Sequence, residues 1–277
     1  MLDNFYINDI IRNALKEDIP FGDITTDSLI AADSVSRARL IAKENGIIAG
    51  LEVCEAVFKF LDSGVEFEKN VAEGVPVKNG DVIAHIRGNT RALLKAERTA
   101  LNFLQRLSGI ATATNQLCAR VAGLPVKIAD TRKTTPGLRF LEKYAVRTGG
   151  GSNHRFCLSD GVLIKDNHIK AAGGIKKAVE LCREKIPHTV KIEVETESLE
   201  QVKEALEARA DIIMLDNMSL DRMKEAVKFI GKRALVEASG NVSLENVHDV
   251  ACTGVDIISA GWITHSARAL DISLRIL

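Results

Sequence analysis

The chain has 277 residues, enough for one large domain or two unequal ones with a substantial buried core. Its 37 Lys and Arg balance its 37 Asp and Glu, and it has one Trp and two Tyr, which argues against a nucleic-acid groove with stacking side chains. Five scattered cysteines without a C-x-x-C pair argue against a disulfide framework or a zinc site. No apolar run approaches the ~20 residues of a membrane span, and the N-terminus lacks a signal-peptide pattern. We therefore expect a cytoplasmic protein with small-molecule partners, and neither a nucleic-acid nor a membrane partner.

The first part of the chain predicts a small domain of mixed helices and strands. Apolar residues at helical spacing over 7–16 predict an amphipathic helix. Short runs that alternate or are continuously apolar, broken by glycines, predict strands around one further helix. The strands are expected within 36–50, 64–74 and 81–89, and the helix at 51–61.

A leucine stripe over 90–121 predicts one long helix, or two helices joined near Ser108-Gly109, that crosses from the first domain to the second. Beyond it, strand-like runs alternate with helical patterns, and the ends of the last four lie 21, 23 and 22 residues apart, which is typical of βα units. Each helical crossover returns the chain to the same edge, so the strands must be parallel. The six runs lie at 126–130, 162–167, 190–195, 211–216, 234–239 and 256–261.

Parallel βα units either close into a barrel or remain an open, doubly wound sheet. Polar residues at the carboxyl ends of the strands favour a barrel, because barrel enzymes assemble their sites there; these residues are Asp130, Lys165, Glu195, Asp216 and Ser239. Six strands predict an incomplete, TIM-like α/β barrel. An open Rossmann-type sheet is the alternative, weakened because no G-x-G-x-x-G follows an early strand.

Basic charge is concentrated between Lys127 and Lys170, where nine Lys and Arg face four Asp and Glu, a local excess of +5 in a neutral chain. The cations are interleaved with three consecutive glycines, which predicts a loop-built pocket for a small, multiply anionic ligand. Arginine binds a carboxylate through two parallel hydrogen bonds. Ordinary surface ion pairs are the alternative for each residue. The candidates are Arg132, Lys133, His154, Arg155 and Lys165, with Arg98 and Arg139 as additions.

Two acidic residues and two glycine loops complete the predicted strand-end site. Glu195 and Asp216 end consecutive strands ~4.8 Å apart, so both carboxylates can reach one Mg²⁺ or one ribose diol, directly or through water. Pairing with Lys165 is the alternative for these acids. Ser239-Gly240-Asn241 and Ala260-Gly261 predict backbone N–H groups that bind a phosphate, against the alternative of simple turns.

Eight motifs stand out along the chain: EDIPFGDITTD, TRKTTPGLR, GGGSNHR, LIKDNHI, EVE, IMLDN, ASGN and SAG. Together they closely resemble the quinolinate phosphoribosyltransferase family, nearly from end to end. The resemblance implies an N-terminal α/β sandwich domain over 1–112 and an incomplete α/β barrel over 113–265. A C-terminal helix over 266–277 is expected to pack back on the first domain. The resemblance also implies a homodimer and Mg²⁺-dependent use of phosphoribosyl pyrophosphate, with no organic cofactor.

The same resemblance implies a role for each candidate. The transferase would join quinolinate to phosphoribosyl pyrophosphate and release nicotinate mononucleotide, pyrophosphate and CO₂, a step of de novo NAD biosynthesis. Catalysis would fall to Lys133, Lys165, Glu195 and Asp216, the last two also serving the ribose and its metal. Quinolinate and the pyrophosphate would be held by Arg132, Lys133, His154, Arg155 and Lys165, with Arg98 entering the neighbouring subunit's pocket and Ser239, Gly240 and Gly261 at the 5′-phosphate.

Three other functions compete with this interpretation. A Schiff-base lyase would use Lys165 as an amine nucleophile at a barrel strand end. A phosphate-ligand sensor would bind on the same barrel without turnover. A sister enzyme of the same fold would use a different aromatic acid or a nucleobase as the acceptor.

Overall fold

A six-stranded parallel sheet and a four-stranded antiparallel sheet form the cores of two separate units. The structure, a computed structural model, describes residues 4–277. Unit 1 holds the described residues up to Asn115, together with Thr134–Gly150 and Ile263–Leu277, and unit 2 holds Gln116–Lys133 and Gly151–Trp262. The predicted boundaries place all of 113–265 in the barrel domain, whereas in the structure 134–150 belongs to unit 1. No helix within 4–277 is long and apolar enough to cross a membrane.

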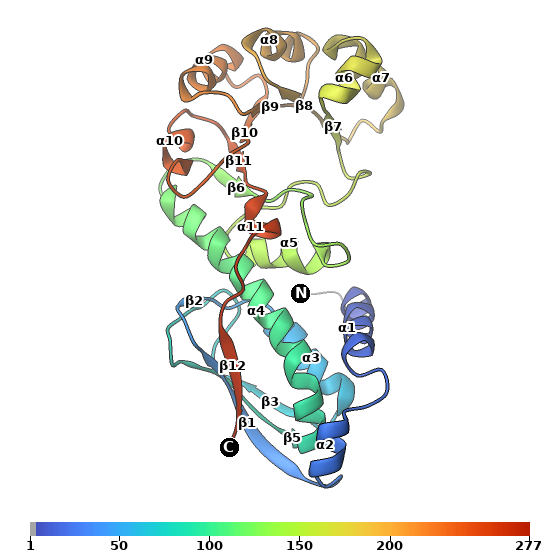
Figure 1. The fold of residues 1–277 in the computed structure, drawn as a ribbon. Helices are drawn as coiled ribbons and strands as arrows, with labels where there is room; N and C mark the ends of the chain where they lie inside the picture. The colour runs from blue at the N-terminus through green and yellow to red at the C-terminus, as the bar shows by residue number, and fades with distance from the viewer. Residues whose placement is uncertain (1–3) are drawn as a thin grey trace. The chain divides into compact units, whose positions relative to one another are not determined.

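Unit 1 is an antiparallel sheet with helices packed on it (Figure 1). Helix α3 coincides with the predicted helix, and the ring of its buried Phe58 lies 6.2 Å from the ring of Phe67 on β3. The sheet order is β12-β1-β5-β3. The strands are β1 (Val35–Ala42), β3 (Glu66–Lys69), β5 (Val82–Asn89) and β12 (Ile272–Ile276), with a separate pair β2 (Gly46–Ile47) and β4 (Pro76–Val77). The helices are α1 (Asn4–Asp18), α2 (Ile24–Leu29), α3 (Leu51–Leu61), α5 (Arg139–Thr148) and most of α4 (Thr90–Arg120), up to Asn115.

The predicted C-terminal helix over 266–277 is wrong, because Ile272–Ile276 forms strand β12. It pairs antiparallel with β1, from Ala42 opposite Ile272 to Ala38 opposite Ile276. The apolar residues of the segment alternate with Ser273 and Arg275, which is the period of a strand. Pairing with β1 satisfies backbone N–H and C=O groups that a single short helix would leave partly unpaired at its ends.

Helix α4 is one continuous helix, so the break considered near Gly109 does not occur. A Cβ atom at Gly109 would lie 2.1 Å from the carbonyl oxygen of Arg268, well inside van der Waals contact. The glycine therefore serves close packing, because it lets the chain at 268–269 pass directly against the helix.

Replacing Gly109 by alanine is expected to lower the free energy of unfolding by about 2 kcal/mol. The clash with a backbone carbonyl outweighs the better helix propensity of alanine, which is worth about 1 kcal/mol. Gly161→Ala is the matched control, because a Cβ there has nothing within 4 Å, and it should change stability by less than about 0.5 kcal/mol. Urea unfolding of the two variants checks this, and equal stabilities would contradict the packing role.

Unit 2 is the predicted incomplete barrel, with six parallel strands in the order β6-β11-β10-β9-β8-β7. Helices α6 to α10 lie outside the curved sheet (Figure 1). Ser198 and Ser219 accept hydrogen bonds from backbone N–H groups at the starts of α8 and α9, as N-caps do. The strands are β6 (Lys127–Ala129), β7 (Val162–Ile164), β8 (Ile192–Thr196), β9 (Ile212–Asp216), β10 (Leu235–Ser239) and β11 (Ile257–Ser259). The helices are α6 (Asp166–Ala172), α7 (Ile175–Lys185), α8 (Leu199–Glu207), α9 (Leu220–Ile230), α10 (Val247–Ala251) and α11 (Trp262–His265), which ends in unit 1.

The register of the sheet decides which side chains share its concave face. Glu195 is opposite Met214, and Asp216 is opposite Ser239. Paired residues point to the same side of a sheet, and residues two apart on a strand do so as well. The face that bears the predicted strand-end residues therefore also carries Glu193 and Glu237, one step deeper along β8 and β10.

Candidate active site

An ion pair joins two of the predicted site residues at the carboxyl ends of neighbouring strands. Lys165, directly after β7, places its Nζ on Oε2 of Glu195 in β8. The register makes this possible, because Ile164 is opposite Val194. The lysine side chain is 46% exposed and that of Glu195 only 13%. The ammonium group is therefore open to solvent on one side and paired on the other with a largely buried carboxylate. The pairing that the sequence left open is therefore present.

A second group of polar residues surrounds Asp216 at the end of β9. The Nδ2 of Asn217 donates to Oδ2 of Asp216 at 2.9 Å, and Nδ2 of Asn241 donates to Oδ1 of Asn217 at 3.0 Å. A Cβ at Gly240 would lie 2.2 Å from Oδ1 of Asn217. Gly240 thus leaves room for the amide that orients Asp216. Asn217, at φ 53°, was missed from the sequence, although IMLDN places it directly after the acid.

The glycine-rich loop that follows α5 is anchored by Asp130, which is fully buried at the end of β6. Its Oδ1 accepts the backbone N–H of His154 at 2.8 Å, and its Oδ2 accepts Nδ2 of Asn153 at 2.6 Å. Ser152 also donates its backbone N–H to Ile128 in β6 at 2.7 Å. The loop at 152–155 is therefore fixed to the strand rather than free to move.

Arg155 is half-buried at this loop and donates from Nη1 to the carbonyl oxygen of Gly161 at 2.8 Å. Burial, and next the nearby charge of Arg132, lower the pKa of the Arg155 guanidinium, while the charge of Glu193 acts in the opposite sense. An arginine remains charged at neutral pH despite such a shift. Two cations held close together are stabilised by an anion between them, which is what a carboxylate-binding site requires.

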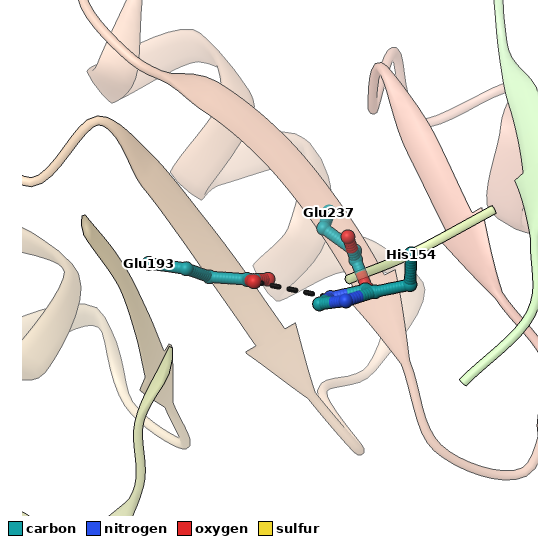
Figure 2. Close-up of side chains that lie close together, drawn as sticks. All are labelled: His154, Glu193 and Glu237. Atoms are coloured by element: carbon teal, nitrogen blue, oxygen red, sulfur yellow. Dashed lines mark ion pairs between the residues drawn. The ribbon is translucent and has the colours of Figure 1, made fainter. Parts of the chain in front are cut away.

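Below the strand ends, His154 meets two buried glutamates (Figure 2). Its Nε2 lies 3.1 Å from Oε2 of Glu193 and 3.7 Å from Oε1 of Glu237, and the two glutamate side chains are 5% and 2% exposed. Burial, and then the neighbouring Glu193, raise the pKa of Glu237 to about 7. Both glutamates were missed from the sequence, although each stands two residues before a predicted strand-end residue and so shares its face.

A cavity of about 650 Å³ opens inside the barrel and reaches this buried cluster. Its volume is in the range of small-molecule sites. Loop residues His154 and Arg155 contribute to its wall, together with Glu193 and Glu237. The remaining wall comes largely from the amino ends of the strands, and includes Lys127, Val162, Lys191, Ile212 and Ile257.

The remaining predicted site residues are divided between the two units. Arg98 is exposed on α4 and Arg139 begins α5, where its Nε donates to Oγ1 of Thr134 at 2.9 Å; both belong to unit 1. Lys133 is exposed in unit 2, and its backbone N–H donates to Oγ1 of Thr131 at 3.0 Å. The half-buried residues at the ends of β10 and β11 are Ser239, Gly240 and Gly261. Unit 2 alone thus carries every candidate except Arg98 and Arg139.

Glu195 and Asp216 have the chemistry of a magnesium site. Carboxylate oxygens are hard ligands, and Mg²⁺ in phosphate-binding enzymes is held by one or two carboxylates, several waters and substrate phosphates. Lys165 bonds Oε2 of Glu195 and Asn217 bonds Oδ2 of Asp216, which leaves the second oxygen of each carboxylate for a cation or a water. The residues present therefore fit Mg²⁺.

Comparison with known proteins supports one family for both units. Residues 23–108 match the model of the quinolinate phosphoribosyl transferase N-terminal domain, and residues 110–275 match that of the C-terminal domain. A protein of Synechocystis named as a probable carboxylating nicotinate-nucleotide pyrophosphorylase is 48% identical over 96% of this chain and 91% of its own length. A Bacillus subtilis protein of the same name is 44% identical over 99% and 95%. The crystal structure of NadC from Streptococcus pyogenes has a TM-score of 0.96 at 43% identity, covering 100% of this chain and 99% of that one. The chain belongs to the quinolinate phosphoribosyltransferase family.

Proposed function

We propose that the protein transfers a phosphoribosyl group to quinolinate and releases nicotinate mononucleotide, pyrophosphate and CO₂. The family membership supports this reaction, as do the names of the relatives. The observation that carries it at the site is the combination, in one barrel, of the Arg132–Arg155 pair with a row of strand-end carboxylates. The two arginines would bind the carboxylates of a diacid, and the strand-end carboxylates would stabilise the positive charge that develops on the ribose.

The reaction proceeds by one bond exchange and one decarboxylation. The pyridine nitrogen forms a bond to C1 of the ribose while the bond from C1 to the pyrophosphate oxygen breaks, and pyrophosphate leaves with that electron pair. The bond from C2 of the ring to its carboxylate then breaks and CO₂ leaves. Its electron pair stays at C2, stabilised by the positively charged ring nitrogen, until a proton from solvent replaces the lost carboxylate.

The residues supply electrostatics and alignment rather than covalent chemistry. Arg132 and Arg155 would bind the quinolinate carboxylates, which holds two mutually repelling polyanions in reacting order. Glu195 and Asp216 would face the ribose, where departure of pyrophosphate makes C1 positive. Ser239, Gly240 and Gly261 would bind the 5′-phosphate through backbone N–H groups. Lys133 and Lys165 would bind the pyrophosphate.

The environment of Lys165 favours this transfer over Schiff-base chemistry. A lysine nucleophile must be a neutral amine, usually in a desolvated pocket. Here the side chain is 46% exposed rather than desolvated, and its Nζ is paired with the Glu195 carboxylate. An ammonium group binds anions but does not attack a carbonyl.

Mg²⁺ is proposed as the cofactor, held by Glu195 and Asp216 directly or through water. Such an ion neutralises charge on phosphate oxygens when it is bound. A homodimer in which Arg98 reaches the neighbouring site is also part of this proposal; its support is that Arg98 is exposed on α4. The cytoplasmic location stays a prediction.

Incubation of the purified protein with quinolinate, phosphoribosyl pyrophosphate and MgCl₂ tests the function. We expect nicotinate mononucleotide, pyrophosphate and CO₂ in equal amounts. Nicotinic acid in place of quinolinate is the control for a sister activity, and we expect it to yield no nucleotide because it lacks the second carboxylate. Product from nicotinic acid alone, or none from quinolinate, would contradict the proposal.

A further inference from the structure

Glu193 and Glu237 have no part in the reaction described above, yet both are buried against His154 (Figure 2). One ligand atom from each of the three residues lies within 4.8 Å of the others, the spacing of a site for a divalent cation. Two carboxylates and an imidazole around so small a space can either bind a metal ion or contact one another directly, with protons between them. The hydrogen bonds of the imidazole decide between these two arrangements.

The second ring nitrogen of His154 excludes the metal arrangement. The backbone N–H of Arg155 donates to Nδ1 at 2.7 Å, so Nδ1 carries a lone pair and the ring proton belongs on Nε2. A metal on Nε2 needs the opposite tautomer, in which Nδ1 bears the proton. Nε2 instead lies at ion-pair distance, 3.1 Å, from Oε2 of Glu193. The imidazole therefore has protein groups next to both of its nitrogens.

The two glutamates differ in their surroundings, and this affects how easily each carboxylate is ionised. Two adjacent buried carboxylates are costly if both are ionised, and one is normally protonated. Glu237 is the more buried of the two side chains, and Asp130 adds a further negative charge nearby, whereas His154 acts in the opposite sense.

The imidazole in turn holds the residue that follows it. Its Nδ1 bonds the backbone of Arg155, while the Asp130 carboxylate bonds the backbone of His154 at 2.8 Å. We propose that Glu193 and Glu237 are positioning residues that fix the imidazole of His154 and, through it, the backbone of Arg155 in the place where its guanidinium meets a substrate carboxylate. The contacts of His154 support the positioning role by themselves, whereas the identity of the substrate depends on the proposed function.

Steady-state kinetics measure the positioning. Glu193→Ala should raise KM for quinolinate about tenfold, because the carboxylate that lies 3.1 Å from Nε2 of His154 is lost. KM for phosphoribosyl pyrophosphate should change less than about twofold. Glu193→Gln should recover part of this loss, since its amide oxygen can occupy the same place beside Nε2. Glu237→Ala should also raise KM for quinolinate, and Glu237→Gln should recover most of it, since an amide mimics a neutral carboxyl group.

The matched control is Glu225→Gln on the exposed face of α9, which should behave as the wild type. An unchanged KM for quinolinate in both Glu193→Ala and Glu237→Ala would overturn the proposal. So would an equal rise in both KM values with a large fall in melting temperature, since that is the result of a purely structural role.

Nitrogen-15 NMR of histidine-labelled protein tests the tautomer without any turnover. His154→Gln identifies the His154 signals by their loss. We expect the wild type to carry its ring proton on Nε2, and Glu193→Ala to alter the Nε2 signal. A proton on Nδ1, or one equivalent of tightly bound divalent metal that Glu193→Ala removes, would overturn the proposal. If the wild type does not turn over quinolinate, the proposed function fails, and this spectrum still decides the positioning.

Discussion

Arg155→Ala is expected to lower kcat/KM for quinolinate by about 10² to 10³-fold. Truncating one partner of a desolvated, hydrogen-bonded charge pair costs about 2–5 kcal/mol, and each 1.4 kcal/mol is a factor of ten. Arg155 is half-buried and close enough to Arg132 for the two charges to interact, so its loss would remove one of the two proposed anion-binding groups. Steady-state kinetics with varied quinolinate at saturating phosphoribosyl pyrophosphate give this number.

The stability of that variant should stay close to the wild type. The side chain makes a hydrogen bond to the carbonyl of Gly161 but faces a second cation, so its removal also relieves repulsion. Arg222→Ala, on the exposed face of α9, is the matched control and should keep full activity. A fully active Arg155→Ala enzyme would show that the basic loop does not bind the diacid.

Removal of divalent metal is the second large effect, and excess EDTA should lower turnover to below about 1% of the starting rate. A metal ion that neutralises phosphate charge contributes several kcal/mol, equal to two or three factors of ten. Restoring MgCl₂ should restore the rate. Asp216→Asn should raise the Mg²⁺ concentration needed for half-maximal activity and lower kcat about 10²-fold, because one of the two proposed carboxylates loses its charge.

Asp221→Asn is the matched control for Asp216→Asn, since Asp221 lies exposed in the first turn of α9. It should show the wild-type dependence on Mg²⁺. Full activity in excess EDTA would remove the metal from the account. A normal Mg²⁺ dependence in Asp216→Asn would remove Asp216 as its ligand.

The parts of the fold that could be predicted from the sequence are those in which apolar residues recur at a clear helical or strand spacing and all face the core. The helix at 51–61 and the six parallel strands have clear apolar patterns, and the structure has them at the predicted places. The C-terminal segment is too short for its alternation to outweigh a helical interpretation, and the available edge of β1 decided it. Gly109 is a normal helix residue here because of a carbonyl 159 positions later at Arg268, a contact that no local pattern contains.

The candidate site was predictable in composition but not in its pairings. Strand ends pointed to Lys165, Glu195 and Asp216, and the register of β7, β8 and β9 then determined that Lys165 meets Glu195. Glu193 and Glu237 do not stand at strand ends and were not predicted. Side chains two residues apart on a strand point to the same side of the sheet, so both lie on the face that carries the strand-end residues. The tautomer of His154 could not be predicted, because it depends on a backbone N–H of the next residue and on two distant strands.

In the proposed function, the barrel of unit 2 binds a diacid through the basic loop, next to carboxylates that face a ribose. A crystal structure of the protein with quinolinate bound tests it most directly. We expect both quinolinate carboxylates within hydrogen-bond distance of Arg132 and Arg155, with the ring nitrogen turned toward Glu195 and Asp216. Quinolinate bound with neither arginine in contact would contradict it.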